Sequence, residues 1–256
     1  MGTQLIEPQS PRLAGADERR LSIVEHLEEL RKRLWICAAV ILVASLGSAT
    51  FAGALVEWLK RPAGSLLPRL AFFSPPEAFV AHLKVAVTAG LILSLPIILH
   101  ELWMFIRPGL TRRERTAGLA FVWWGSALFT AGGAFAYWVV LPVCLRFLLA
   151  FGGSELEAVI SISRYLSFAT MVIVACGAMF ELPLAVWLLT ASGVITPQWL
   201  RRHWRHAVVG VVVAAALLTP TADVATMILL AVPMLALYEL SIWIASAAAP
   251  RKAQDV

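Results

Sequence analysis

The stretch HLEELRKRLWICAAVILVASLGSATFAGALV, residues 26–56, joins a charged segment to a long apolar run. Its first nine residues carry two glutamates, one histidine and three basic side chains, whereas the run from Trp35 to Val56 contains no charged residue. An α-helix needs about 20 mostly apolar residues to cross the hydrocarbon core of a bilayer. Residues 35–56 therefore predict a transmembrane helix, with a charged helix preceding it at the membrane surface.

The rest of the chain has the same apolar character. Of its 256 residues, 60% are hydrophobic and 14% are charged, and the mean hydropathy is +0.80. A soluble domain of this length cannot bury so much apolar surface, so we expect an integral membrane protein. The apolar runs lack the alternation of a membrane β-barrel, which leaves an all-α fold of six transmembrane helices. They lie at residues 35–56, 79–106, 118–142, 164–190, 207–218 and 224–247.

The two ends of the chain and the last helix pair depart from this pattern. We expect residues 1–20 to be a disordered cytoplasmic tail, residues 21–247 the six-helix membrane domain, and residues 248–256 a cytoplasmic C-terminal tail. The run at 207–218 would cover about 18 Å as a helix, against a hydrocarbon core of about 30 Å. The reversal at 219–223 is short, so the last two helices should form a short antiparallel pair.

The basic residues predict the orientation of the helices in the membrane. Six lie before the first span, four at 107–117, three at 191–206 and two after the last span, against three near 57–77. Loops rich in lysine and arginine stay on the cytoplasmic side. We therefore expect both termini in the cytoplasm, and we attribute the net charge of +5 to topology rather than to nucleic-acid binding.

Residues that could support catalysis or metal binding do not form the required patterns. HELWM at 100–104 begins like the zinc-protease motif HExxH, but Met104 replaces the second histidine. The chain contains no GxxxxGK[ST] phosphate loop and no GxSxG nucleophile motif. Cys37, Cys144 and Cys176 each stand alone in an apolar run, which favours a packing role. We expect no enzymatic activity, no catalytic residue, no metal and no cofactor.

Two acidic residues outside the N-terminal segment stand out by position. Glu181, followed by Pro183, lies well inside the run at 164–190, where an ionised carboxylate costs about 2–3 kcal/mol or more to insert. It should face a partner, a cavity or a polar substrate, or else be a hydrogen-bonded packing residue. Asp223 lies in the reversal before the last helix, where it could have a functional role or could cap that helix. Glu101, nearer the predicted cytoplasmic end of its run, is expected to snorkel toward the membrane surface.

The segment HLEELRKRL is itself predicted to be an amphipathic helix. Apolar residues recur along one narrow stripe at helical spacing (Ile23, Leu27, Leu30 and Leu34). Glu28 and Lys32, and likewise Glu29 and Arg33, are four residues apart with the glutamate first, which is the favourable order for a pair. The spacing alone therefore leaves open the alternative that this segment is only an interfacial helix whose charged residues pair with one another.

Four motifs in order resemble TatC, the multispanning receptor subunit of the twin-arginine protein translocase. The resemblance covers about residues 21–247 and implies six spans with a short final pair in a concave bundle. Its motifs are HLEELRKRL (26–34), LWMFIRPGLTRRER (102–115), FELPLAVWLLTASGVIT (180–196) and LLTPTADVATMILLAVPMLALYE (217–239).

The resemblance implies a binding site for signal peptides that display two consecutive arginines. A carboxylate accepts the planar fork of a guanidinium through two hydrogen bonds. By resemblance, Glu29 and Glu114 are the two carboxylates, and Phe105 is an aromatic residue that lines the same site. The signature around Glu29 adds His26, Leu30, Arg31 and Arg33.

The resemblance also implies partners and a location. We expect a core subunit that binds folded cargo, lies in the bacterial cytoplasmic membrane and assembles into an oligomeric complex with single-span TatA- and TatB-type subunits, with export driven by the proton-motive force. Residues matching transport or partner-contact positions are Glu181, Asp223, Thr219 and Pro62. Met227 departs from the family, because many relatives carry a glutamine there.

Two other functions remain as alternatives. A small-solute secondary transporter would show inverted repeats and paired discontinuous helices, and the chain shows neither pattern. A purely structural assembly subunit would give no function to Glu29 or Glu114.

Overall fold

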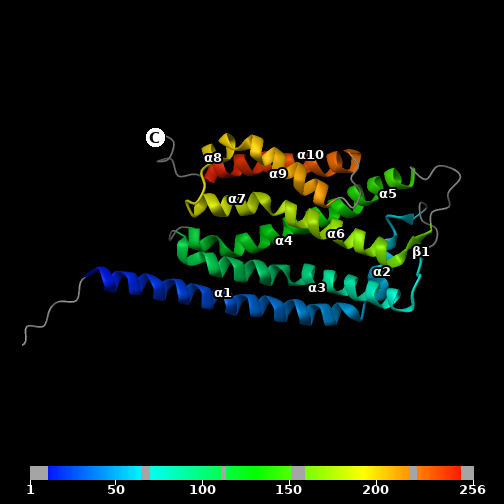
Figure 1. Ribbon diagram of the computed structural model, residues 1–256, viewed down its shortest axis with the longest axis horizontal. Helices are drawn as coiled ribbons and strands as arrows, with labels where there is room; N and C mark the ends of the chain where they lie inside the picture. Colours follow the sequence, from blue (N-terminus) through cyan, green and yellow to red (C-terminus); the bar gives the residue numbers. More distant parts are fainter. Residues whose placement is uncertain (1–10, 65–69, 111–113, 151–158, 219–223, 249–256) are drawn as a thin grey trace, which may run out of the picture.

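The protein is a bundle of long helices, seen here in a computed structural model that describes residues 11–64, 70–110, 114–150, 159–218 and 224–248 (Figure 1). The helices run along the long axis of the bundle, and two short strands lie at one end. The elements are α1 (Pro11–Ala49), α2 (Ala52–Lys60), β1 (Leu70–Ala71), α3 (Pro75–Ile106), η2 (Arg107–Gly109), η3 (Glu114–Ala117), α4 (Gly118–Phe135), η4 (Ala136–Val140), α5 (Leu141–Ala150), β2 (Ile160–Ser161), α6 (Ile162–Phe180), α7 (Leu182–Ala191), α8 (Pro197–Arg202), α9 (Trp204–Leu218) and α10 (Val224–Ala248).

Within the described residues, five helical segments are long and apolar enough to cross a membrane. They are Val24–Ala49, Pro75–Ile106, Gly118–Ala150, Ile162–Ala191 and Thr226–Ser246. The predicted fifth run is α9, whose 15 residues extend about 22 Å, shorter than a bilayer core of about 30 Å. The mostly helical membrane fold is thus confirmed, and α9 is the one apolar helix of the described part that is too short on this criterion.

The first helix is longer than the sequence pattern predicted. α1 begins at Pro11 and continues without interruption to Ala49, so it takes in half of the segment expected to be a disordered tail. It ends before the predicted boundary at residue 56, because the chain turns at Thr50 and Phe51 and starts α2. The charged segment and the first span are therefore one continuous helix.

Small residues let neighbouring helices pack closely. α1 packs along α3 at Gly90, where an added Cβ would lie 2.5 Å from the backbone nitrogen of Ser45. α4 packs on α6 at Gly132, where an added Cβ would lie 2.5 Å from the carbonyl oxygen of Cys176. Close approach at small residues is a principal source of helix association in membranes, where water cannot drive apolar surfaces together. These contacts position α1, α3, α4 and α6 side by side (Figure 1).

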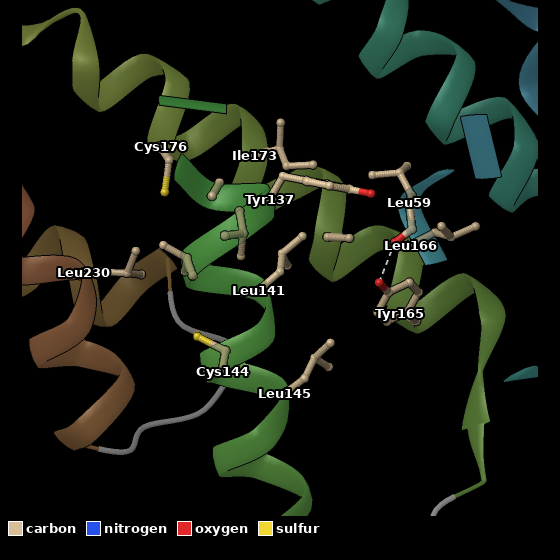
Figure 2. Close-up of a cluster of buried hydrophobic side chains, with 14 of the residues drawn as sticks. Leu59, Tyr137, Leu141, Cys144, Leu145, Tyr165, Leu166, Ile173, Cys176 and Leu230 are labelled. Atoms are coloured by element: carbon tan, nitrogen blue, oxygen red, sulfur yellow. Dashed lines mark hydrogen bonds between the residues drawn. The ribbon is translucent and has the colours of Figure 1, made fainter. Parts of the chain in front are cut away.

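Two buried tyrosines fix the end of the bundle that carries the strands. The Tyr165 hydroxyl donates to the carbonyl of Leu59 at 2.6 Å (Figure 2). The Tyr137 hydroxyl donates to the carbonyl of Trp58 at 2.8 Å. Both carbonyls are in the last turn of α2, and that of Trp58 also accepts from the backbone N–H of Arg61. The surrounding cluster of apolar side chains includes Cys144 and Cys176, which are buried, in keeping with a packing role.

The opposite end of the bundle gathers the start of α1, the end of α3, η2, α8 and the end of α10 (Figure 1). The turns that join α3 to α4 and α7 to α9 both lie there. These elements include the start of α1, η2 and α8, which belong to the N-terminal segment and to the loops at 107–117 and 191–206. The sequence predicted all three segments on one side of the membrane, and they meet at this end, where α10 also ends. We call it the α1–α8 end.

Candidate functional site

Three charged side chains join α1 to α3 near the α1–α8 end. Arg33 donates from Nη2 and Nε to Oε1 of Glu29, at 2.5 and 3.2 Å, and from Nη1 to Oε2 of Glu101 at 2.8 Å. The guanidinium and Glu101 are well shielded, with 17% and 15% of their side chains exposed, whereas Glu29 is 36% exposed. We call Glu29, Arg33 and Glu101 the triad.

One antiparallel register between α1 and α3 brings the triad together. Ser45 packs against Gly90, and Arg33 lies 12 residues before Ser45 while Glu101 lies 11 residues after Gly90. Two straight antiparallel helices that touch at the first pair must therefore approach again near the second, since each residue adds the same rise. The close packing at Gly90 thus positions the charged contact.

The predicted pairing within α1 is half confirmed. Glu29 and Arg33 form the expected ion pair four residues apart. Glu28 and Lys32 are both exposed, and the ion pairs of the described residues do not include theirs. The pair that forms is the one on the face turned toward α3, because Glu101 fixes the other side of the guanidinium.

An aromatic stack closes the same site. The rings of His26 and Phe105 are stacked with centroids 4.2 Å apart and planes 14° apart, and His26 Nδ1 lies 3.9 Å from Oε2 of Glu29. His26 is on α1 and Phe105 is one turn after Glu101 on α3. The structure therefore brings together four of the predicted residues: His26, Glu29, Arg33 and Phe105.

The remaining predicted residues of this region lie around the triad or outside the described side chains. Leu30 is half-buried and Arg31 is exposed, and Arg31 lines an open groove along α1 with Glu25, Glu28, Glu29, Lys32 and Trp35. Glu114 begins the turn η3, and its side chain lies outside the described residues.

Glu101 is the residue that sequence reasoning missed. Its position in the run at 79–106 suggested a carboxylate that snorkels toward the membrane surface. A usable signal was present, because Glu101 and Phe105 are four residues apart and so share one face of a helix. What the sequence does not contain is the register that places this face against Arg33.

Glu181 lies in the break between α6 and α7, away from the triad. Its backbone caps the end of α6, and Pro183 is the second residue of α7. The carboxylate faces α4, where its Oε2 would be 3.3 Å from a Cβ on Gly125, and its buried Oε1 has no hydrogen-bond partner among the described residues. The side chain therefore needs a proton or a polar group supplied from outside the described chain.

The other predicted contact residues are not gathered at either place. Pro62 lies in the turn after α2, at the end of the bundle that carries the strands. Thr219 and Asp223 lie outside the described residues. Met227 is half-buried and packs against the main apolar cluster. Among the described residues, no cluster of histidine, cysteine, aspartate or glutamate has the arrangement of a metal site.

The chemistry that the triad can perform is recognition of a cation. It contains no nucleophile and no metal ligands beyond two carboxylates, and one of those carboxylates is reachable from outside. A carboxylate that keeps an accessible oxygen beside a stacked aromatic pair can accept hydrogen bonds from a guanidinium.

The sequence and the fold of this chain match those of known proteins. The family model for the Sec-independent protein translocase protein TatC matches residues 25–233. The TatC of Helicobacter pylori is 40% identical over 225 residues, covering 88% of this chain and 87% of its own length. The chloroplastic TATC of Arabidopsis thaliana is 38% identical over 227 residues, 89% of this chain and 67% of its own. A crystal structure of the twin-arginine translocase receptor TatC matches with a TM-score of 0.78 and 36% identity, over 87% of this chain and 99% of that one.

Proposed function

Because this chain belongs to the TatC family and is a component of the Sec-independent translocase, we propose that it is the receptor that binds twin-arginine signal peptides. The observation that carries the proposal is Glu29, whose carboxylate is held in place by Arg33 but remains partly exposed. One oxygen accepts from Arg33, and among the described residues the other has only the 3.9 Å approach of His26. An incoming guanidinium can bind this second oxygen.

The remaining residues of the site have supporting roles in this proposal. The stack of His26 on Phe105 gives an apolar wall beside Glu29, against which a guanidinium plane can lie. Glu114 follows η2 and begins η3, so the loop after α3 supplies a second carboxylate for the second arginine. Leu30 and Arg31 complete the surface on α1.

The direct test is binding of a synthetic signal peptide to the purified protein in lipid nanodiscs. A peptide with two consecutive arginines should bind, and the same peptide with two lysines should bind about 10-fold more weakly, because an ammonium cannot form the parallel pair of hydrogen bonds. Equal affinities for the two peptides would contradict the receptor function.

The proposal includes a membrane topology with six spans and both termini in the cytoplasm. α9 then counts as a short span, and the α1–α8 end with the triad faces the cytoplasm. In a cysteine-free background, single cysteines placed at Ser10 and Ala253 should resist an impermeant thiol reagent added from outside. A cysteine at Phe73, which is exposed at the other end, should react and serves as the control. Labelling at both termini would invert the topology and the site with it.

We also propose that the chain works with TatA- and TatB-type single-span subunits in the bacterial cytoplasmic membrane, in an oligomeric complex driven by the proton-motive force. Glu181 supports this role, because its buried oxygen lacks a hydrogen-bond partner among the described residues. Thr219, Asp223 and Pro62 remain contact positions by family resemblance. Met227 is an apolar residue that packs against the apolar cluster, so it offers partners no polar contact at that position.

Glu181 should act after the signal has bound. Glu181→Gln and Glu181→Ala are expected to keep signal-peptide crosslinking while cargo export falls, about 3-fold for Gln and about 10-fold for Ala, since Gln can still hydrogen-bond a partner. Crosslinking and export would be measured separately at equal protein abundance. Loss of folded protein in the Ala variant would instead identify Glu181 as a packing residue, and normal export would remove it from the mechanism.

A further inference from the structure

The triad carries one negative charge that it does not neutralise itself. Two carboxylates face one guanidinium, so the formal net charge is −1. Among the described residues, the other basic groups beside it are His26, 3.9 Å from Glu29, and His100, 3.8 Å from Glu101, and each is a cation only when protonated. The permanent charges of the described side chains therefore leave the triad short of one cation.

The two carboxylates of the triad differ in what they can accept. Arg33 directs two of its donors to a single oxygen of Glu29 and one donor to Glu101. Glu101 is the inner carboxylate with 15% of its side chain exposed, and Glu29 is the outer one with 36%. An external donor can thus reach Glu29, while Glu101 serves the internal guanidinium.

We propose that Glu101 is a positioning residue that holds and neutralises Arg33, and thereby keeps Glu29 available for an arginine from outside. This inference rests on the proposed function. If Glu101 were uncharged, Arg33 and Glu29 would form a closed neutral pair. An incoming guanidinium at the open oxygen of Glu29 would then meet a pair with no net charge, and it would gain little attraction from that pair.

With Glu101 charged, the triad keeps its net charge of −1 and attracts the arginine of the signal peptide. The arriving guanidinium takes the open oxygen of Glu29, and Arg33 remains neutralised through its contact with Glu101. No charge is left without a partner, which matters because an unpaired ion in a partly buried site is expensive. Glu101 on α3 thus controls whether Glu29 on α1 can bind an arginine from outside.

The test measures the affinity of the twin-arginine peptide for wild type and Glu101→Gln in nanodiscs. The amide oxygen of glutamine can still accept from Arg33, so the link between α1 and α3 is retained while the charge is removed. We expect the affinity to fall about 10-fold. Glu239→Gln removes the same charge from an exposed position on α10 and should leave the affinity unchanged.

A double variant separates charge from structure. Arg33→Gln together with Glu101→Gln leaves Glu29 as the charged member of the triad and restores its net charge of −1. Affinity should recover to within about 3-fold of wild type, and its salt dependence should recover with it. If Glu101 only held the two helices together, the double variant would bind as weakly as Glu101→Gln or more weakly.

The outcomes distinguish this inference from the proposed function. Unchanged affinity in Glu101→Gln, or no recovery in the double variant, would overturn the role of Glu101 while wild type still prefers two arginines to two lysines. A wild type without that preference would overturn the receptor function, and the role of Glu101 with it.

Discussion

Replacing Glu29 by lysine is expected to abolish export of twin-arginine cargo and to weaken signal binding by about 100-fold. The substitution removes the open carboxylate and puts an ammonium beside Arg33, so two cations would meet the incoming guanidinium. Truncating one partner of a desolvated charge pair costs about 2–5 kcal/mol, and each factor of ten in affinity corresponds to about 1.4 kcal/mol. Export of a folded cargo and peptide affinity in nanodiscs would both be measured.

The control for this variant is Glu28→Lys. It makes the same charge change one residue earlier on α1, at an exposed side chain that is in none of the described ion pairs. We expect its export and affinity to stay close to wild type. If Glu29→Lys were present in the membrane at normal abundance and exported cargo at normal rates, Glu29 would be no more than a pairing residue of the interfacial helix.

Replacing Gly90 by isoleucine is expected to separate α1 from α3 and so to destroy the site from a distance. An added Cβ would lie 2.5 and 2.6 Å from the backbone nitrogen and Cα of Ser45, and real Cβ atoms essentially never approach other atoms within 3.0 Å. Backbone atoms cannot rotate aside, so the helices themselves must move. Overpacking of this kind costs about 1–3 kcal/mol or more.

The loss of helix packing has a consequence at the triad. Arg33 bridges Glu29 on α1 and Glu101 on α3, so separating the helices breaks the bridge. We expect a lower midpoint of thermal unfolding in detergent and a peptide affinity reduced by about 10-fold or more. Gly47→Ile is the matched control, because an added Cβ on Gly47 has no atom within 4 Å. Normal stability and affinity in Gly90→Ile would show that the α1–α3 contact does not position the site.

The parts of the structure that are periodic along the chain could be predicted from sequence. Five of the six apolar runs predicted helices that are long and apolar enough to span a membrane, and the four-residue spacing of Glu29 and Arg33 predicted their ion pair, because both are properties of a single helix. The continuous α1 was not predicted. The Pro- and Gln-containing composition of the first residues suggested a tail, and the turn at Thr50 has no strong helix-breaking residue.

Contacts between helices could not be predicted in this way. Glu101 was read as a snorkelling carboxylate, since a helical pattern shows which residues share a face but not which helix that face meets. The spacing likewise offered two equal pairs on α1, and only packing against α3 selects Glu29 over Glu28. Resemblance to TatC supplied His26 and Phe105 as site residues, and the structure added that their rings are stacked on each other.

The central claim is that an arginine of the signal peptide binds at Glu29, and site-specific photocrosslinking tests it most directly. A photoreactive residue at Glu25, one turn before Glu29 on the same helix, would be compared with one at the exposed Trp243 on α10. The account predicts that cargo with two arginines crosslinks from position 25 and not from position 243, and that Glu29→Lys removes the product. Equal crosslinking from both positions, or a product from position 25 that persists in Glu29→Lys, would contradict it.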